Sequence, residues 1–259
     1  MTDLDRSGLA ETGVQFGSLA RWRNPQMRPY IYKKSGKFHI LDLQKVITSC
    51  QEVGNYIRSL IEKKKVILFL ATKKQIRDIV KEAAIKCSMP YIVNKWKGGF
   101  LTNFLEIRKK LKELYGVNKF LESNNFKNLL KKEQISLKKR RNKLKNLYEG
   151  VAESDWQPKD LALFIIGLNK EKTAFKEARK AGVPVIAVCN TNCNPHGVDF
   201  VIPGNDENTK SVNFLANLVA DAILELKRGK NIINENNSDL KKPIEKQSEN
   251  HYNKKDLEA

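Results

Sequence analysis

Several features are scarce or missing in this chain of 259 residues. It has 4 cysteines and 3 histidines, and such sparse cysteines are typical of the reduced thiols of a cytosolic protein rather than of a disulfide framework. No apolar run approaches the roughly 18 residues that a membrane-spanning helix requires. The segment from Met1 to Asp5 carries two aspartates and no apolar core, so we do not expect a secretory signal there. These absences indicate a cytosolic protein that does not cross a membrane.

Acidic side chains are also in short supply. The chain has 29 Asp and Glu against 48 Lys and Arg, which gives a formal net charge of +19. The imbalance lies within residues 1–150, because residues 151–229 carry 9 basic and 10 acidic groups and residues 230–259 carry 6 of each. Residues 101–150 are the most basic, with 14 basic and 5 acidic groups. A one-sided excess of this kind indicates a face that binds a polyanion, nucleic acid more often than anionic lipid.

Motifs for catalysis or cofactor binding are missing as well. The sequence has no dinucleotide or Walker-type phosphate loop and no G-x-S-x-G nucleophile elbow, and Gly98-Gly99 is better explained by a tight turn. Cys189, Cys193 and His196 have the spacing C-x3-C-x2-H, which lacks the fourth ligand that zinc normally takes. Buried thiols are the simpler interpretation of this loop, although metal binding stays open. Asp206 is expected to cap the last helix. We therefore expect no enzyme, no cofactor and no metal.

Hydrophobic patterns predict an α/β fold. Continuous apolar runs are typical of strands buried on both faces of a parallel sheet. The predicted strands are 38–41, 66–71, 91–93, 161–166, 183–188 and 200–202. Helices are predicted where apolar residues recur at steps of three and four, over 42–63, 73–87, 171–181 and 207–228. Because strands and helices alternate, the sheet is expected to be mostly parallel.

Residues 101–150 interrupt this alternation. Apolar residues recur at steps of three and four from Phe104 to Leu114 and every seven residues from Leu130 to Val151, with a polar turn between the two series. This pattern predicts an inserted antiparallel helical hairpin of the coiled-coil type. The expected organisation is an RNA-contacting arm at 1–37, an α/β domain formed by 38–100 and 151–229, the hairpin at 101–150, and a disordered polar tail at 230–259.

Three basic segments carry the candidate nucleic-acid contacts. Arg21-Trp22-Arg23 alternates guanidinium groups, which pair with phosphates, with an aromatic ring that can stack on an unpaired base. Lys95-Trp96-Lys97 repeats the pattern, and either tryptophan could instead anchor a core. Lys138–Arg141 lies on the second hairpin helix, where a merely solvated face is the alternative. The candidate contacts are Arg21, Trp22, Arg23, Asn24, Arg28, Lys33, Lys34, Lys37, Lys95, Trp96, Lys97, Thr102, Asn103, Lys138, Lys139, Arg140 and Arg141.

Five segments in order resemble the bacterial-type small-subunit ribosomal protein S-two family. They are Gly13–Gly17, Arg21–Met27, His39–Leu43, Trp96–Asn103 and Gly197–Asp206. The resemblance covers about residues 10–229 and implies a three-layer α/β domain with a protruding hairpin. It also implies a structural, non-catalytic role in the small ribosomal subunit, in contact with small-subunit ribosomal RNA near the junction of head and body. Family members often read His-Phe-Gly-His where this chain has Gln15-Phe16-Gly17-Ser18.

The resemblance further implies neighbouring small-subunit ribosomal proteins as partners, with the large S-one protein as a candidate, and a monomer within the ribosome. The abundance of Lys, Asn and Ile indicates low-GC coding, so the ribosome is expected in the cytoplasm of a bacterium or in an organelle. An RNA-modifying α/β enzyme is disfavoured by the missing phosphate loop. An adaptor without an RNA role is disfavoured by the one-sided charge. A ribosomal scaffold protein is the function that we expect.

Overall fold

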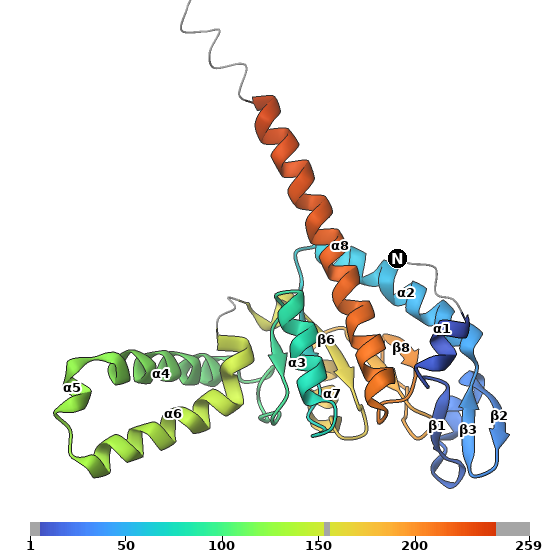
Figure 1. Cartoon of the computed structure of the whole chain (residues 1–259), viewed down its shortest axis with the longest axis horizontal. Helices are drawn as coiled ribbons and strands as arrows, with labels where there is room; N and C mark the ends of the chain where they lie inside the picture. The colour runs from blue at the N-terminus through green and yellow to red at the C-terminus, as the bar shows by residue number, and fades with distance from the viewer. Residues whose placement is uncertain (1–5, 153–155, 242–259) are drawn as a thin grey trace, which may run out of the picture.

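The computed structural model describes residues 6–152 and 156–241, and it contains a five-stranded parallel sheet with helices on both faces (Figure 1). The strands, in the spatial order β5-β4-β6-β7-β8, are β4 (Val66–Leu70), β5 (Tyr91–Ile92), β6 (Leu161–Ile166), β7 (Val185–Cys189) and β8 (Phe200–Pro203). The main helices around the sheet are α2 (Leu43–Glu62), α3 (Arg77–Lys86), α7 (Lys172–Ala181) and α8 (Thr209–Lys241). The predicted three-layer α/β architecture is confirmed.

Alternate residues of each central strand face opposite layers, as the period of two in a strand requires. Ile67 and Phe69 of β4 pack in a core with α2, α3 and α8. Leu68 and Leu70 belong to a second core, which contains residues of α7, the loop around Phe100 and the base of the hairpin. Both faces of the sheet are therefore covered, which explains why its strands read as unbroken apolar runs.

The segment before α2 differs from the loose arm that the sequence suggested. It contains α1 (Arg6–Glu11), two 3-10 turns (Ala20–Trp22 and Pro25–Tyr30), and the strands β1 (Phe16–Leu19) and β2 (Ile31–Ser35). These strands pair with β3 (Phe38–Leu41) in an antiparallel sheet of order β1-β3-β2. Leu9, Val14 and Met27 are buried and fasten the segment to the domain. Strands of only four or five residues are too short to leave a sustained period in the sequence.

The segment at 101–150 forms α4 (Phe104–Glu122), α5 (Asn124–Lys127) and α6 (Lys131–Ala152). Contacts join α4 to α6, and the pair projects from the domain (Figure 1). Ile107 and Leu114 are buried on the first helix, and Leu144 and Val151 on the second. Leu130 is 73% exposed because it precedes the first turn of α6, so the predicted seven-residue series does not extend to it. The coiled-coil type of packing stays a prediction.

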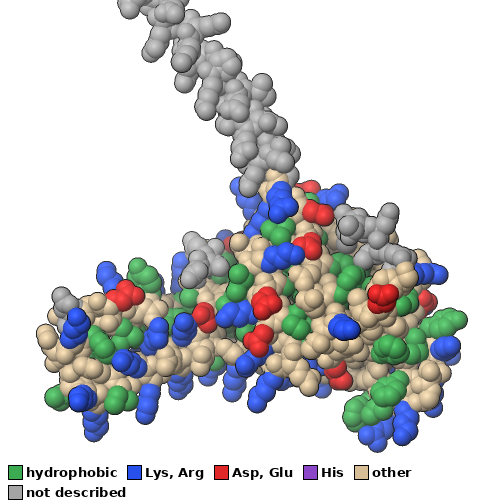
Figure 2. All heavy atoms as spheres, viewed as in Figure 1, with side chains coloured by type: hydrophobic (Ala, Val, Ile, Leu, Met, Phe, Trp, Pro, Cys, Tyr) green, Lys and Arg blue, Asp and Glu red, His purple; other side chains and the backbone are tan. Residues whose placement is uncertain are grey.

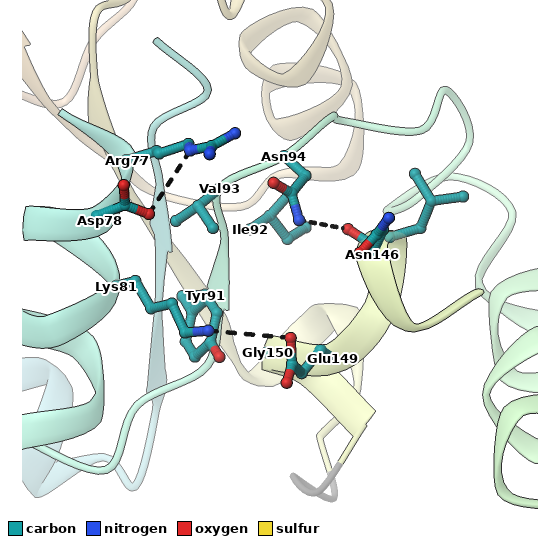
Figure 3. A pocket seen from close by; sticks show the side chains of 11 residues that line it. Arg77, Asp78, Lys81, Tyr91, Ile92, Val93, Asn94, Asn146, Glu149 and Gly150 are labelled. Carbon is teal, nitrogen blue, oxygen red and sulfur yellow. Dashed lines mark hydrogen bonds and ion pairs between the residues drawn. The ribbon is translucent and has the colours of Figure 1, made fainter. Parts of the chain in front are cut away.

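The base of this projecting pair meets the edge of the sheet (Figure 3). The amide Nδ2 of Asn94 donates to the carbonyl of Asn146 at 2.7 Å, and α6 approaches so closely that a Cβ on Gly150 would lie 2.3 Å from the carbonyl oxygen of Tyr91. The hollow between these elements measures about 90 Å³, well below the roughly 300–1,000 Å³ of ligand pockets. We interpret it as a packing seam that fixes α6 to β5.

The last helix is longer than expected. α8 reaches Lys241, whereas the sequence predicted a helix ending near residue 228 and a disordered tail from residue 230. Residues 230–241 contain neither glycine nor proline, so no residue of either type interrupts the helix before Pro243. The structure extends the helix to Lys241, the predicted disorder of the tail stays a prediction, and residues 242–259 lie outside the described residues.

Candidate nucleic-acid interface

The small antiparallel sheet and its turns present the amino-terminal basic surface, which we define by six exposed cations: Arg21, Arg23, Arg28, Lys33, Lys34 and Lys37. Exposed aromatic rings lie among them, from Phe16, Trp22, Tyr32 and Phe38. Figure 2 shows hydrophobic and basic side chains gathered over this part of the molecule. Exposed rings beside cations are the combination that stacks on bases and pairs with phosphates.

The charges of this surface are available to a ligand. Within residues 6–152 and 156–241, none of the six cations has a carboxylate partner. The Arg21 guanidinium lies 4.9 Å from the centroid of the Trp22 ring, which is cation–π distance. Burial, and then the positive charges of Arg23 and Lys34, lower the pKa of His39. The surface therefore has a positive field that disfavours a further cation.

Asn24 supports this surface from within. Its side-chain Oδ1 accepts a hydrogen bond from the backbone N–H of Gln26 at 2.9 Å and so caps the second 3-10 turn. Its backbone N–H donates to the carbonyl of Thr191 at 2.9 Å. These bonds engage its acceptor and its main chain, so Asn24 has a structural role whether or not its side chain also meets RNA.

The loop before α4 presents a second group of candidate contacts. Lys95, Lys97, Thr102 and Asn103 are exposed. Trp96 is only 8% exposed and packs against Phe100, with ring centroids 4.9 Å apart. Its ring is therefore a core anchor, the alternative that the sequence left open, and contact of Trp96 with RNA stays a prediction.

A single carboxylate on α7 holds that loop in place. Glu177 accepts hydrogen bonds from the Trp96 indole N–H at 3.3 Å, the Gly99 N–H at 2.8 Å and the Leu101 N–H at 3.2 Å. Gly99 adopts φ +86°, a conformation that glycine adopts readily, which is consistent with the tight turn expected there. Sequence reasoning missed Glu177, because an isolated glutamate on a helix face carries no signal of a partner 76 to 81 residues away.

The basic run on α6 divides into two kinds of residue. Lys138 and Lys139 are exposed. Arg140, in contrast, pairs with Glu113 of α4 at 2.6 Å, and Arg141 donates to the Asn118 side chain at 3.4 Å. Hydrogen bonds from Arg140 and then Lys110 lower the pKa of Glu113. Part of the hairpin charge is thus used to join the two helices.

The carboxyl ends of the parallel strands, where α/β sheets commonly bind ligands, are covered by the chain itself. Lys73 Nζ and Asp206 Oδ2 form an ion pair at 2.7 Å, and the segment around Ser18 lies over the end of β7. The sequence predicted that Asp206 caps the last helix, but it does not. Asn208 does so, by accepting from the Lys210 N–H at 3.0 Å, because the Asp206 carboxylate is engaged by the lysine.

The cysteine-rich loop does not bring its three candidate ligands together. Cys189 and Cys193 are fully buried, whereas His196 is exposed. A hydrogen bond with Cys193, together with burial, raises the pKa of the Cys189 thiol, and the same hydrogen bond lowers the pKa of Cys193. Among the described residues, no group of three or more His, Cys, Asp or Glu side chains is placed to hold a metal ion.

These features define an α/β protein that presents exposed cations and aromatic rings around a sheet whose strand ends are covered. A search of protein families gives the more specific class. The model of the family described as ribosomal protein S2 matches residues 9–226, and the chain belongs to that family. It is therefore a small-subunit ribosomal protein, of a family that is structural rather than enzymatic and that binds ribosomal RNA and other ribosomal proteins. In the described part of the chain, no helix combines the length and apolarity needed to span a bilayer.

Proposed function

We propose that this chain is a structural constituent of the small ribosomal subunit that binds small-subunit ribosomal RNA near the junction of head and body and supports translation. The amino-terminal basic surface is the main contact. The observation that carries the proposal is the group of six exposed cations without carboxylate partners, set among exposed aromatic rings. Arginines suit this role because a guanidinium pairs with phosphate in a bidentate manner.

The other two basic segments make secondary contacts. Lys95, Lys97, Thr102 and Asn103 form a rigid edge because Glu177 fixes the loop from below. On the hairpin, Lys138 and Lys139 contact phosphates more readily than Arg140, which already has a carboxylate partner. Neighbouring small-subunit proteins cover further surface, and the S-one protein is a candidate partner. The chain acts as a monomer within a cytoplasmic or organellar ribosome.

The salt dependence of binding tests the amino-terminal contact. The triple variant Arg21→Ala, Arg23→Ala, Arg28→Ala should bind small-subunit ribosomal RNA more weakly. It should also lower the slope of log K against log salt by about 2, since each lost contact to single-stranded phosphate removes about 0.7. The matched control replaces Lys172, Lys176 and Lys180, which are exposed on α7, with alanine. The control should leave the slope unchanged.

Two outcomes would overturn the proposal. Equal slopes for the arginine triple and the wild type would show that the surface does not contact phosphates. A cellular pool of free chain, with little cosedimentation with small subunits, would show that the chain is not a constituent of the ribosome.

On the hairpin, the pair Lys138→Ala, Lys139→Ala should lower the slope more than the pair Arg140→Ala, Arg141→Ala.

A further inference from the structure

A chain of polar groups, made of a half-buried lysine and two buried residues, runs across the carboxyl ends of the parallel strands. Lys73 follows β4, Asn190 follows β7 and Asp206 follows β8. Lys73 Nζ contacts Asp206 Oδ2 at 2.7 Å, and Asn190 Nδ2 donates to Asp206 Oδ1 at 2.9 Å. The Asn190 side chain is 1% exposed and Asp206 is 2% exposed. We call these three residues the strand-end relay.

The relay ends on the small antiparallel sheet. The backbone N–H of Ser18, in β1, donates to Asn190 Oδ1 at 2.9 Å and to Thr191 Oγ1 at 2.9 Å. The two hydroxyl oxygens of Ser18 and Thr191 lie 2.8 Å apart. A Cβ on Gly17 would lie 2.5 Å from Thr191 Cγ2, so the backbone of β1 sits directly on the end of β7. No other side chain could occupy position 17 without a shift.

Each member of the relay orients the next. An asparagine amide has one accepting and one donating end, and the Asp206 carboxylate can only accept from Asn190. The amide is therefore turned so that its oxygen faces the Ser18 N–H. The Lys73 ammonium in turn holds Asp206, whose buried carboxylate would otherwise have only the neutral Asn190 amide as a side-chain partner. Room for the lysine stem comes from Gly167, where a Cβ would lie 3.1 Å from Lys73 Cε.

We propose that Lys73, Asp206 and Asn190 are positioning residues for RNA binding: they dock the small antiparallel sheet and so set the orientation of the amino-terminal basic surface. This inference rests on the proposed function of that surface. The relay does not contact RNA. It acts by keeping the surface in the binding-competent arrangement, and apparent affinity falls in proportion to the fraction of molecules that are docked.

Hydrogen exchange on the full chain tests the docking, with the variants Asn190→Ala and Asp206→Asn. In both, amides of residues 16–41 should exchange about tenfold faster or more, the factor expected from the loss of one buried hydrogen-bond partner. Amides of β6 should keep their wild-type rates. The matched control is Asp221→Asn, which breaks the exposed pair of Lys86 and Asp221, 2.6 Å apart between α3 and α8, and it should change neither region. In the double variant, the factor by which exchange is accelerated should be smaller than the product of the two single-variant factors, because both substitutions act through one relay.

RNA titration of the same variants tests the positioning. The dissociation constant for small-subunit ribosomal RNA should rise as the reciprocal of the docked fraction, by about threefold where that fraction falls to one third, while the slope against log salt keeps its wild-type value because the phosphate contacts are intact once the sheet is docked. A lowered slope, faster exchange throughout the chain, unchanged exchange at residues 16–41, or unchanged affinity in a variant that is mostly undocked would each overturn the proposal. Failure of the wild-type chain to bind RNA would instead refute the proposed function, and the exchange pattern would still report the docking.

Discussion

Two places in the molecule have the same local sequence pattern and opposite structures. Arg21-Trp22-Arg23 and Lys95-Trp96-Lys97 each place a tryptophan between two cations. Trp22 is 56% exposed on the amino-terminal basic surface, whereas Trp96 is 8% exposed in a core. In both triplets the flanking cations point to solvent. The pattern therefore reports the exposure of the charges and says nothing about the ring.

The difference lies in partners that are distant in sequence. Trp96 meets an aromatic cluster in which Phe100 stacks on Trp156, with centroids 5.4 Å apart, and its indole N–H reaches Glu177. The partner near Trp22 is its own neighbour, Arg21. A cation–tryptophan–cation triplet in a basic protein is thus a candidate base-stacking site only when the rest of the fold supplies no pocket for the ring.

The largest expected effect comes from removing each ring. Trp96→Ala should lower the free energy of unfolding by about 3–5 kcal/mol, the usual cost of deleting a large buried aromatic side chain. Trp22→Ala should change it by about 0.5 kcal/mol or less, as exposed substitutions do, while weakening RNA binding by about 1–3 kcal/mol if a base stacks on the ring. Denaturant titration and RNA titration of both variants measure the two quantities.

The variant Trp22→Phe is the control for this pair, because it keeps an aromatic face and should retain most of the RNA affinity. The comparison fails if Trp22→Ala destabilises the fold as much as Trp96→Ala does. It also fails if the Trp22→Ala variant binds RNA as tightly as the wild type, since the exposed ring would then have no part in recognition.

An intermediate effect is expected at Glu177, whose carboxylate accepts a hydrogen bond from the Trp96 indole. Glu177→Gln replaces one accepting oxygen with an NH2 group that faces a backbone N–H, so one of the three donors at Trp96, Gly99 and Leu101 loses its acceptor. The expected cost is about 1–3 kcal/mol of unfolding free energy. Denaturant titration measures it, and Glu207→Gln, next to the start of α8, provides a comparison that should cost much less. Equal stabilities of the two variants would show that Glu177 does not hold the loop.

Much of the fold could be predicted because its signals are local. The strands at 66–70 and 161–166 are apolar on both sides, and the helix after Asp42 has a capping residue and an apolar stripe. Of the amino-terminal segment only the strand at 38–41 was predicted; the strands at 16–19 and 31–35 were missed because they are short, and the first is stabilised by docking on Asn190 and Thr191. Long-range hydrogen bonds leave no period in a sequence.

The candidate contacts, like the fold, could be predicted only where the signal is local in sequence. Exposed cations could be found from charge alone, and those of the amino-terminal segment are all at the surface. Whether a cation is free to bind a ligand could not be predicted, because this depends on ion pairs between distant parts of the fold. Arg140 resembles Lys139 in sequence but pairs with Glu113 on the facing helix. The roles of Asp206 and Glu177 were hidden for the same reason, since each acts on residues far from it along the chain.

The smallest expected effect is a pH dependence that reports the field of the amino-terminal surface. Burial, Arg23 and Lys34 lower the pKa of His39 below its ordinary value, so the unfolded chain takes up this proton at a higher pH than the folded chain does. As pH falls through the ordinary value of about 6.5 towards the lowered folded value, His39 should reduce stability, and below the folded value its contribution should become constant.

Arg23→Ala removes one of the two charges and should raise the pKa of His39, as should bound RNA whose phosphates neutralise that charge. NMR titration of the imidazole measures both shifts, with Lys180→Ala on α7 as the control that should leave the pKa in place. A His39 pKa that rises in Arg23→Ala but does not respond to RNA would show that Arg23 lies outside the interface, and the contrast between Trp22 and Trp96 would then be one of packing alone.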